Sequence, residues 1–316
     1  MTTTTHAFES NDNTDSSGSV DSSKSSLLEN NDEEFDFIES QWEDDVETGL
    51  IIRWPRDRDD DEDNNNNNNN NNNSTIAPRK PLHLSTKLSE DRIAPLFDGV
   101  QWAGTRVWKA AILGLKYLLE HYGDRRSLLE LGCGLGVPGM LWYLLKEEEY
   151  DERRRQQQQQ LENDDTTNGC RVVLTDMPDL LPQLRANVER NFDDNVNSNN
   201  TIRVQALDWS KDGINSLLDE HPQPFDVCLN CDCIYEPLYG KDSWQALADV
   251  LSVIAERSPS TLLVTSVERR KGDGLEDFLQ RLTSSGKVGP IPRVFRDDDD
   301  KHHVIEIYVT QGMQSN

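Results

Sequence analysis

The residues of this chain that could do chemistry gather in short clusters, each of which follows an apolar run. The first cluster is Glu130-Leu-Gly-Cys-Gly-Leu-Gly136, and its alternate glycines, Gly132, Gly134 and Gly136, would let the backbone approach a ligand closely. A dinucleotide-binding fingerprint requires its third glycine at position 137, where this chain has Val137. The spacing therefore disfavours a pyrophosphate site and leaves open a nucleoside ligand without phosphates.

A carboxylate, Asp176, ends the apolar run of residues 171–175. At such a place a carboxylate can accept hydrogen bonds from both hydroxyls of a ribose. Asp176 stands 40 residues after Gly136, where an uninterrupted unit has about 20, and the polar segment 147–168 accounts for the difference. We expect Asp176 to hold a ribose; the simpler alternative is that it caps a helix.

Two tryptophans could supply flat surfaces to the same ligand. Trp209 follows the apolar run of residues 202–207, and its ring could stack on an adenine. Trp108 precedes the glycine-rich turn and could flank the pocket. For each tryptophan the alternative is packing in the core.

The pattern of apolar runs indicates the scaffold that must hold these clusters. Strand-like runs alternate with amphipathic helices, which predicts a mostly parallel sheet with helices on both faces. Ligands bind at the carboxyl ends of the strands in such sheets, so the clusters should meet at one edge. The expected strands are residues 127–131, 171–176, 202–207, 225–230, 261–267, 288–295 and 304–309, and the expected helices are residues 107–122, 178–191, 215–219, 243–256 and 275–282, with a further helix that ends near residue 146.

The N-terminal part of the chain differs in composition from the rest. Residues 1–86 are rich in Ser, Thr, Asn and Asp, which predicts a disordered acidic tail ahead of one domain at 87–316. Charge and glutamine at 147–168 predict a disordered insert in that domain. Apolar residues at 35–38, 42 and 50–54 could dock on the domain or on a partner, or be a stray apolar patch in the tail.

The formal net charge of −26 at pH 7 argues against nucleic acid as a partner, because phosphates need Lys and Arg to neutralise them. A positively charged protein surface suits this acidity better, although a tail that only solubilises is the simpler reading. The chain shows neither a signal-peptide pattern nor a run of about 18 apolar residues. We therefore expect a cytoplasmic protein, with the nucleus as a second compartment and no membrane contact.

Five cysteines, an odd number, argue against a disulfide framework. Cys228 and Cys231 have C-x-x-C spacing, but no second Cys or His pair lies nearby and the two would face opposite sides of a strand. We expect them to pack in the core and expect no metal.

Taken in order, the clusters resemble those of a known enzyme family. The chain resembles the seven-β-strand (class I) S-adenosylmethionine-dependent methyltransferases. The residues that carry this resemblance are Trp108, the turn from Glu130 to Gly136, Thr175-Asp176, Asp208-Trp209 and Asn230-Cys-Asp-Cys-Ile-Tyr235-Glu. Within that group the Asp232-x-x-Tyr235 motif resembles the methyltransferase-like protein-lysine methyltransferases, the lysine methyltransferase family sixteen. The likeness covers about residues 104–310. It implies an α/β, Rossmann-like, seven-stranded and mostly parallel sheet with helices on both faces, the last strand antiparallel, and S-adenosylmethionine as cofactor.

The resemblance assigns cofactor-binding roles to individual residues. The turn bounded by Glu130 and Gly136 would hold the methionine part through Gly132, Cys133 and Gly134. Asp176 would hold the ribose, Trp209 the adenine, Trp108 would line the pocket, and the backbone of Cys231 would touch the cofactor.

The resemblance also implies that Asp232 and Tyr235 are catalytic and face the methyl donor and an incoming lysine. The attacking amine must be neutral, and free lysine titrates near ~10.4, so an apolar and aromatic slot favours loss of its proton. Because a carboxylate raises the pKa of a nearby lysine, we expect Asp232 to orient the amine more than to remove the proton. The alternative is that Asp232 caps the exit of the fourth strand. Glu268-Arg269-Arg270, which follows the fifth strand, could border the substrate opening or simply face solvent.

We expect a monomer that acts on a lysine-containing protein and binds neither nucleic acid nor membrane. One alternative is a small-molecule N-methyltransferase, since the same cofactor half would serve it. Another is a non-catalytic, cofactor-binding interaction protein whose acidic tail engages a basic partner.

Overall fold

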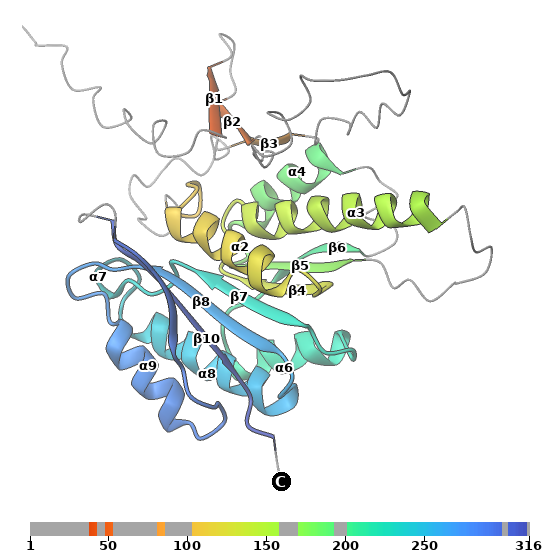
Figure 1. Ribbon diagram of the computed structural model, residues 1–316. Coiled ribbons are helices and arrows are strands. Elements are labelled where there is room, and N and C mark those ends of the chain that lie inside the picture. Colours follow the sequence, from red (N-terminus) through yellow and green to blue (C-terminus); the bar gives the residue numbers. More distant parts are fainter. Residues whose placement is uncertain are drawn as a thin grey trace, which may run out of the picture. The chain divides into compact units, whose positions relative to one another are not determined.

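The computed structural model describes residues 38–42, 48–52, 81–85, 103–157, 170–192, 201–298 and 303–314. Their main feature is a seven-stranded sheet with the strand order β6-β5-β4-β7-β8-β10-β9 (Figure 1). The strands are β4 (Ser127–Leu131), β5 (Arg171–Asp176), β6 (Ile202–Ala206), β7 (Val227–Cys231), β8 (Leu262–Glu268), β9 (Arg293–Asp297) and β10 (Ile305–Gln311).

The sheet is mostly parallel, which confirms the expected fold. β4 pairs in parallel with β5 and β7, and the parallel pairing continues from β5 to β6 and from β7 to β8. The last strand, β10, runs antiparallel to both of its neighbours. Val172, Val173 and Leu174 of β5 are fully buried, as a parallel strand covered on both faces requires.

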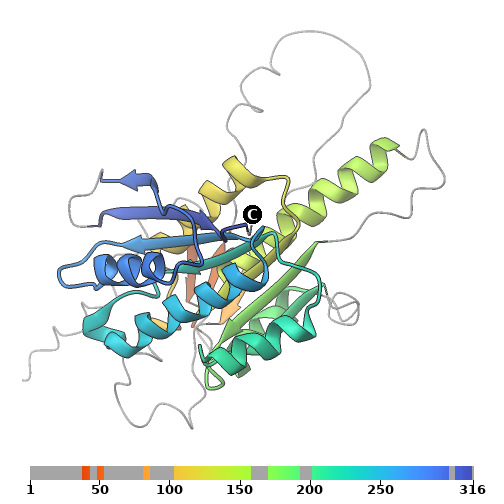
Figure 2. The ribbon, with the colours of Figure 1, turned by 90° about the horizontal axis from the view of Figure 1, so that it is seen from below.

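Helices cover both faces of this sheet (Figures 1 and 2). On one face lie α2 (Lys109–Tyr122), α3 (Val137–Gln157) and α4 (Leu181–Asn191). On the other lie α6 (Lys211–Glu220), α8 (Lys241–Arg257) and α9 (Leu275–Ser284), and the one-turn helix α7 (Glu236–Tyr239) leads from β7 into α8.

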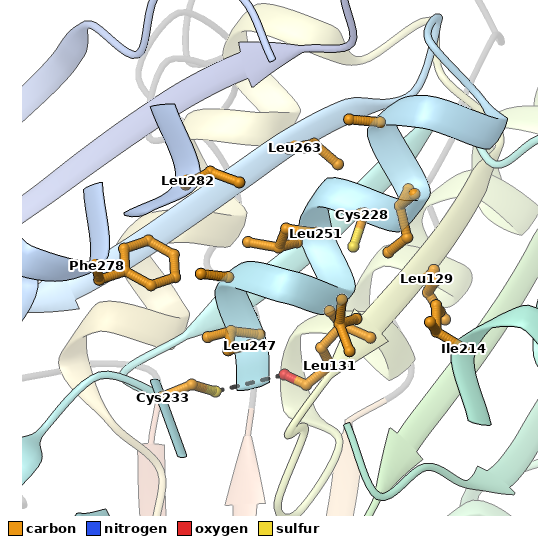
Figure 3. Packing of buried hydrophobic residues seen from close by; sticks show 14 of the residues in the cluster. Leu129, Leu131, Ile214, Cys228, Cys233, Leu247, Leu251, Leu263, Phe278 and Leu282 are labelled. Atoms are coloured by element: carbon orange, nitrogen blue, oxygen red, sulfur yellow. Dashed lines mark hydrogen bonds between the residues drawn. The ribbon is translucent and has the colours of Figure 1, made fainter. Parts of the chain in front are cut away.

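The second of these faces carries a large apolar core (Figure 3). Leu247 and Leu251 of α8 pack on Leu129 and Leu263 of the sheet, and Phe278 of α9 closes the cluster. All five side chains are almost inaccessible to solvent. This packing holds β4 and β7 rigidly, and their ends carry the candidate site.

The expectation that residues 1–86 form only a disordered tail is wrong for three segments. β1 (Ile38–Trp42), β2 (Thr48–Ile52) and β3 (Leu82–Ser85) form an antiparallel sheet in which β2 is central. Ile52 and Leu82 are fully buried. The strands persist because α4 satisfies an edge of the sheet: Asn191 accepts from the amide of His83 and donates to its carbonyl oxygen, and Asn187 does the same for Ser85. Ile51 and Ile52 of the apolar run 50–54 are buried in this small sheet, which β3 joins to α4. The parts of 1–86 other than 38–42, 48–52 and 81–85 lie outside the described residues.

The disordered insert expected at 147–168 is helical in its described part, residues 147–157. α3 does not end near residue 146 but continues to Gln157. Glu, Arg and Gln are good helix formers, and this stretch lacks the Gly or Pro that would end a helix. Residues 158–169 lie outside the described part of the chain.

Among the described residues no helix is long and apolar enough to cross a membrane.

Candidate active site

A cavity of about 440 Å³ opens at the carboxyl ends of β4, β5 and β7. Here the chain leaves the central strand β4 between two neighbours whose connections run in opposite directions, which is where open α/β sheets bind ligands. Of the residues proposed from the sequence, eight cofactor residues and one catalytic residue line this cavity: Trp108, Glu130, Gly132, Cys133, Gly134, Asp176, Trp209, Cys231 and Asp232. Gly136 and Tyr235 are not among its lining residues.

The glycine-rich turn needs glycine for two different reasons. Gly132 and Gly134 have φ of 61° and 54°, and a Cβ atom built on Gly134 would lie 3.1 Å from the carbonyl oxygen of Gly104, another cavity residue. Gly136 has φ of 76°, and its Cβ atom would lie 2.6 Å from the Cδ1 atom of Leu184. The first two glycines therefore keep the cavity wall thin, whereas Gly136 lets α4 pack against the turn. Its predicted contact with the cofactor finds no support in this position.

Asp176 ties the end of β5 to the glycine-rich turn. Its Oδ2 atom accepts a hydrogen bond of 2.7 Å from the amide of Gly134, and its Oδ1 atom accepts one of 2.7 Å from the amide of Met177. Burial raises the pKa of Asp176, and these two backbone hydrogen bonds oppose the rise. Each carboxylate oxygen keeps further lone pairs, so the side chain can still accept from hydroxyl groups in the cavity.

Glu130 borders the same cavity but faces the start of α3. Its Oε2 atom accepts a hydrogen bond of 2.8 Å from the amide of Gly139, in the first turn of that helix. Burial raises the pKa of Glu130 to about 8, although the Gly139 amide lowers it, and the charge of Asp176 raises it further. The main contact of this carboxyl group in the structure is with the backbone.

The two tryptophans stand at separate walls of the cavity. Trp209 has a positive φ of 42°, and its ring lies so close to Gly132 that a Cβ atom there would come within 3.0 Å of it. Trp108 immediately precedes α2 and donates from its indole nitrogen to the carbonyl oxygen of Ala103 at 3.0 Å. Both residues line the cavity, while Trp209 also packs against the apolar core and the Trp108 ring also lies under the guanidinium of Arg270.

Asp232 occupies a strained backbone position directly after β7. Its φ of 53° is unusual for a residue other than glycine, and its side chain is nearly fully buried. Its Oδ1 atom accepts from the amide of Glu268 at 3.1 Å. Strain of this kind is found at functional sites, where the surrounding structure holds it in place.

Arg270 forms a bidentate ion pair with Asp232. Its Nη1 atom donates to Oδ1 at 3.0 Å and its Nη2 atom donates to Oδ2 at 2.8 Å. Burial raises the pKa of Asp232, and the hydrogen bonds and charge of Arg270 oppose the rise. Of the two readings of the 268–270 charge run, solvent exposure is wrong for Arg270, because this carboxylate holds its guanidinium inside.

Tyr235 is not among the cavity residues, and the guanidinium of Arg270 lies over its ring. The Cζ atom of Arg270 is 5.0 Å from the centroid of the Tyr235 ring and 5.4 Å from that of Trp108. The aromatic wall expected for a lysine is thus already covered by a cation from this chain.

Tyr239 is a cavity residue that the motifs did not reveal. It lies one helical turn after Tyr235 in α7, and its amide bonds the Tyr235 carbonyl oxygen at 2.9 Å. Burial raises the pKa of its hydroxyl well above the usual value, as do the nearby charges of Cys233 and Asp232. The i, i+4 spacing of two tyrosines was the available signal, since such residues share a helix face.

The three cysteines in and after β7 lie in different surroundings. Cys228 packs in the apolar core beside α8, whereas the Cys231 sulfur lies on the α2 side, 3.3 Å from where a Cβ atom of Gly114 would be. Cys233 bonds the carbonyl oxygen of Leu131 at 3.5 Å (Figure 3). Burial raises the pKa of all three thiols. The described residues contain no group of three His, Cys, Asp or Glu side chains able to hold a metal ion.

These residues fit a nucleoside cofactor with an amino-acid tail. Two positive-φ glycines leave backbone open to close approach, one buried carboxylate can receive hydroxyl groups, and two aromatic rings offer stacking surfaces. The cavity volume falls within the range of about 300–1,000 Å³ typical of small-molecule sites.

Comparison with known proteins identifies relatives of this fold. Residues 88–285 match a family model described as lysine methyltransferase. "EEF1A lysine methyltransferase 3" of Xenopus tropicalis is 30% identical over 196 residues, which cover 61% of this chain and 70% of that protein. "Secreted RxLR effector protein 48" of Plasmopara viticola is 35% identical over 113 residues, 34% of this chain and 57% of that protein. "Protein-lysine N-methyltransferase EFM2" of Saccharomyces cerevisiae is 30% identical over 113 residues, 35% of this chain and only 22% of that protein.

Proposed function

The chain belongs to the lysine methyltransferase family, and from this premise we propose that it transfers a methyl group from S-adenosylmethionine to the side-chain amine of a lysine in a protein. The observation that carries the proposal is the meeting of the glycine-rich turn, Asp176, Trp209 and Asp232 around one cavity. They come from the ends of four different strands, and no single motif would specify that arrangement.

The cofactor half of the site is the wall formed by the turn, Asp176 and the two tryptophans. We assign Gly132, Cys133 and Gly134 to the methionine part, Asp176 to the ribose hydroxyls and Trp209 to the adenine. When bound, S-adenosylmethionine supplies a methyl group on a positively charged sulfur. Because the reaction is an in-line displacement, the contribution of the protein is chiefly to position the two reactants.

The acceptor half of the site is the wall that carries Asp232 and Tyr239. A carboxylate oxygen at this place can accept from an amine and fix the direction of its lone pair. We therefore propose Asp232 as the catalytic residue that orients the amine, and Tyr239 as the aromatic wall beside it. Tyr235 supports this wall from behind Arg270.

The first substrate to test is EEF1A, because relatives from Xenopus tropicalis and Mus musculus are named for its methylation. Purified protein would be incubated with EEF1A and methyl-labelled S-adenosylmethionine, and the modified residue located by mass spectrometry. A parallel incubation would use extract from cells that lack this gene. Label on a lysine of a protein supports the proposal.

The matched control is Asp232→Asn, which keeps the size of the side chain. The proposal fails if folded, cofactor-binding wild-type protein labels no protein in either incubation. Label recovered in small metabolites would establish the small-molecule alternative instead. A stable complex with one partner, insensitive to Asp232→Asn and without label, would establish the non-catalytic alternative.

We further propose that the enzyme acts as a monomer in the cytoplasm, with the nucleus as a second compartment. The absence of disulfides among the five cysteines supports a reducing compartment. Fractionation of cells that express a tagged full-length chain tests the location, and light scattering tests the oligomeric state. Recovery of the tagged protein in the culture medium would contradict the proposed location. A molecular mass of two chains would contradict the proposed monomer.

A further inference from the structure

Arg270 is the most completely held cation near the cavity. Both terminal nitrogens of its guanidinium donate hydrogen bonds to the carboxylate of Asp232, and Nη2 also donates to the Oε2 atom of Glu268. Trp108 and Tyr235 both place rings within 5.4 Å of its Cζ atom. Its side chain retains 20% of its solvent exposure.

These contacts make Arg270 a fixed part of the wall. A bidentate guanidinium–carboxylate pair fixes orientation as well as distance, and removal of one partner would leave the other charge buried and uncompensated. The stacking surfaces suit a planar guanidinium and would not suit an ammonium group equally well. Arg270 therefore stays in place when an acceptor enters, and the acceptor reaches Asp232 from the Tyr239 side.

A lone carboxylate at this position would oppose the reaction. It would attract a lysine as the ammonium ion, which has no lone pair for attack, and would raise the pKa of that lysine. A permanent positive charge beside the carboxylate offsets part of this effect, because the guanidinium holds both oxygens of Asp232 and repels an ammonium ion, although the same guanidinium also pairs with Glu268.

Several other ionisable groups face the pair. They are Glu268, which pairs with Arg270, and His303, which contacts Glu268 at 2.8 Å; Tyr235 and Tyr239 of the α7 segment; and Cys233 after β7. Burial alone would lower the pKa of Arg270, but the hydrogen bonds and charge of Asp232 and the charge of Glu268 outweigh it and raise the pKa. Arg270 is therefore charged at neutral pH.

We propose that Arg270 is a positioning residue for methyl transfer: it fixes both oxygens of Asp232 and offsets the carboxylate charge, so that the acceptor lysine enters beside Tyr239 and becomes a neutral amine there. This inference rests on the proposed function. In the step itself the lysine first loses a proton to solvent. Its nitrogen lone pair then forms the N–C bond while the C–S bond breaks and its electrons stay on sulfur, which leaves a methylated ammonium group and a neutral thioether.

The test compares Arg270→Gln with Arg270→Lys. Arg270→Gln removes the positive charge, so the pKa of the acceptor lysine should rise. The acidic limb of the plot of kcat against pH should then move to higher pH by about one unit or more. Arg270→Lys keeps the charge and loses the bidentate geometry, so kcat should fall while the limb stays near its wild-type position. Arg269→Gln removes the same charge from the adjacent arginine, which pairs with Asp273, Glu276 and Glu306; it serves as the matched control and should leave the limb near its wild-type position.

A second readout does not depend on activity. In protein labelled with ¹³C-aspartate, NMR titration of the Asp232 carboxyl carbon should show a higher pKa in Arg270→Gln than in wild type. Thermal unfolding and cofactor calorimetry establish that each variant is folded.

The outcomes separate this inference from the proposed function. An unchanged acidic limb and an unchanged Asp232 titration in folded Arg270→Gln would overturn the role of Arg270. If wild-type protein modifies no acceptor, the proposed function fails, and an unshifted Asp232 titration in that case would refute the electrostatic role as well.

Discussion

The side-chain oxygen of Asp176 and the backbone amide of Gly134 are joined by a 2.7 Å hydrogen bond between residues 42 positions apart. This bond connects the end of β5 to the turn that follows β4, so the two most recognisable features of the cofactor wall support each other. A change at Asp176 should therefore act both on the ligand and on the turn.

Asp176→Asn should weaken binding of S-adenosylmethionine while the protein stays folded. Loss of the charged acceptor for ribose hydroxyls costs about 1.5–3 kcal/mol, which corresponds to about 10–100-fold in affinity. Isothermal titration calorimetry measures the affinity, and Asp208→Asn is the matched control. Asp208 also lines the cavity but is exposed and bonds Ser210. Equal losses for the two variants would contradict the ribose assignment.

Asp232→Asn should abolish turnover and leave cofactor binding nearly intact. Asn tolerates the left-handed backbone at φ 53° almost as well as Asp, whereas Ala does not, so Asp232→Ala should be less stable by about 1–2 kcal/mol. We expect kcat to fall by about 100-fold or more in Asp232→Asn, in single-turnover assays with saturating cofactor. Wild-type turnover by a folded Asp232→Asn protein would remove Asp232 from the mechanism.

Glu130 should make stability fall as pH rises. Burial raises its pKa in the folded protein to about 8, above the ordinary glutamate value of 4.5, so between these pH values the folded state holds a proton that the unfolded state has released. The resulting loss begins near pH 4.5, is complete above about pH 8, and reaches on the order of several kcal/mol.

Glu130→Gln should remove this pH dependence, because its amide oxygen can still accept from Gly139 but carries no charge. Unfolding in denaturant at pH 5, 7 and 9 measures the difference from wild type. Glu130→Ala leaves the Gly139 amide without this acceptor and should be less stable at every pH. Parallel curves for wild type and Glu130→Gln would show that Glu130 does not titrate in this range.

Gly136→Ala should lower stability more than it lowers cofactor affinity. A Cβ atom at this position meets Leu184 at 2.6 Å and Leu174 at 3.1 Å, and the φ of 76° adds about 1–2 kcal/mol of backbone strain. The melting temperature reports the first effect, and calorimetry below that temperature reports the second. Loss of affinity with an unchanged melting temperature would restore Gly136 to the cofactor site.

The sequence predicted the scaffold well because the periodic signal was strong. Buried parallel strands such as Arg171–Asp176 appear as continuous apolar runs, and parallel pairing brings their carboxyl ends to one edge whatever the length of the connections. That is why Asp176 and Asp232, 56 positions apart in the chain, could both be placed at the cavity.

The sequence did not reveal which charged side chains pair with one another, because several possible partners compete for each arginine. Arg269 and Arg270 are adjacent and chemically equal, yet Arg269 pairs with Asp273, Glu276 and Glu306 while Arg270 turns to Asp232. That choice places the guanidinium of Arg270 over the Tyr235 ring, and no spacing rule expresses it.

Two errors in the element boundaries have a similar origin. β3 depends on amide side chains of α4 about a hundred positions later, so local composition could not reveal it. The second half of α3 is polar throughout, and the apolar periodicity that marks most helices is missing there.

The length of α3 has a consequence for how this protein can change over time. The helix starts at the cavity, where Val137 and Pro138 form part of the wall, and its 21 residues carry the chain about 30 Å away. The return strand β5 begins at Arg171, at the sheet edge opposite Asp176. A segment of any length between Gln157 and Arg171 is therefore attached to the domain at two points remote from the cavity, and we expect a change in its length to leave the chemistry unaltered.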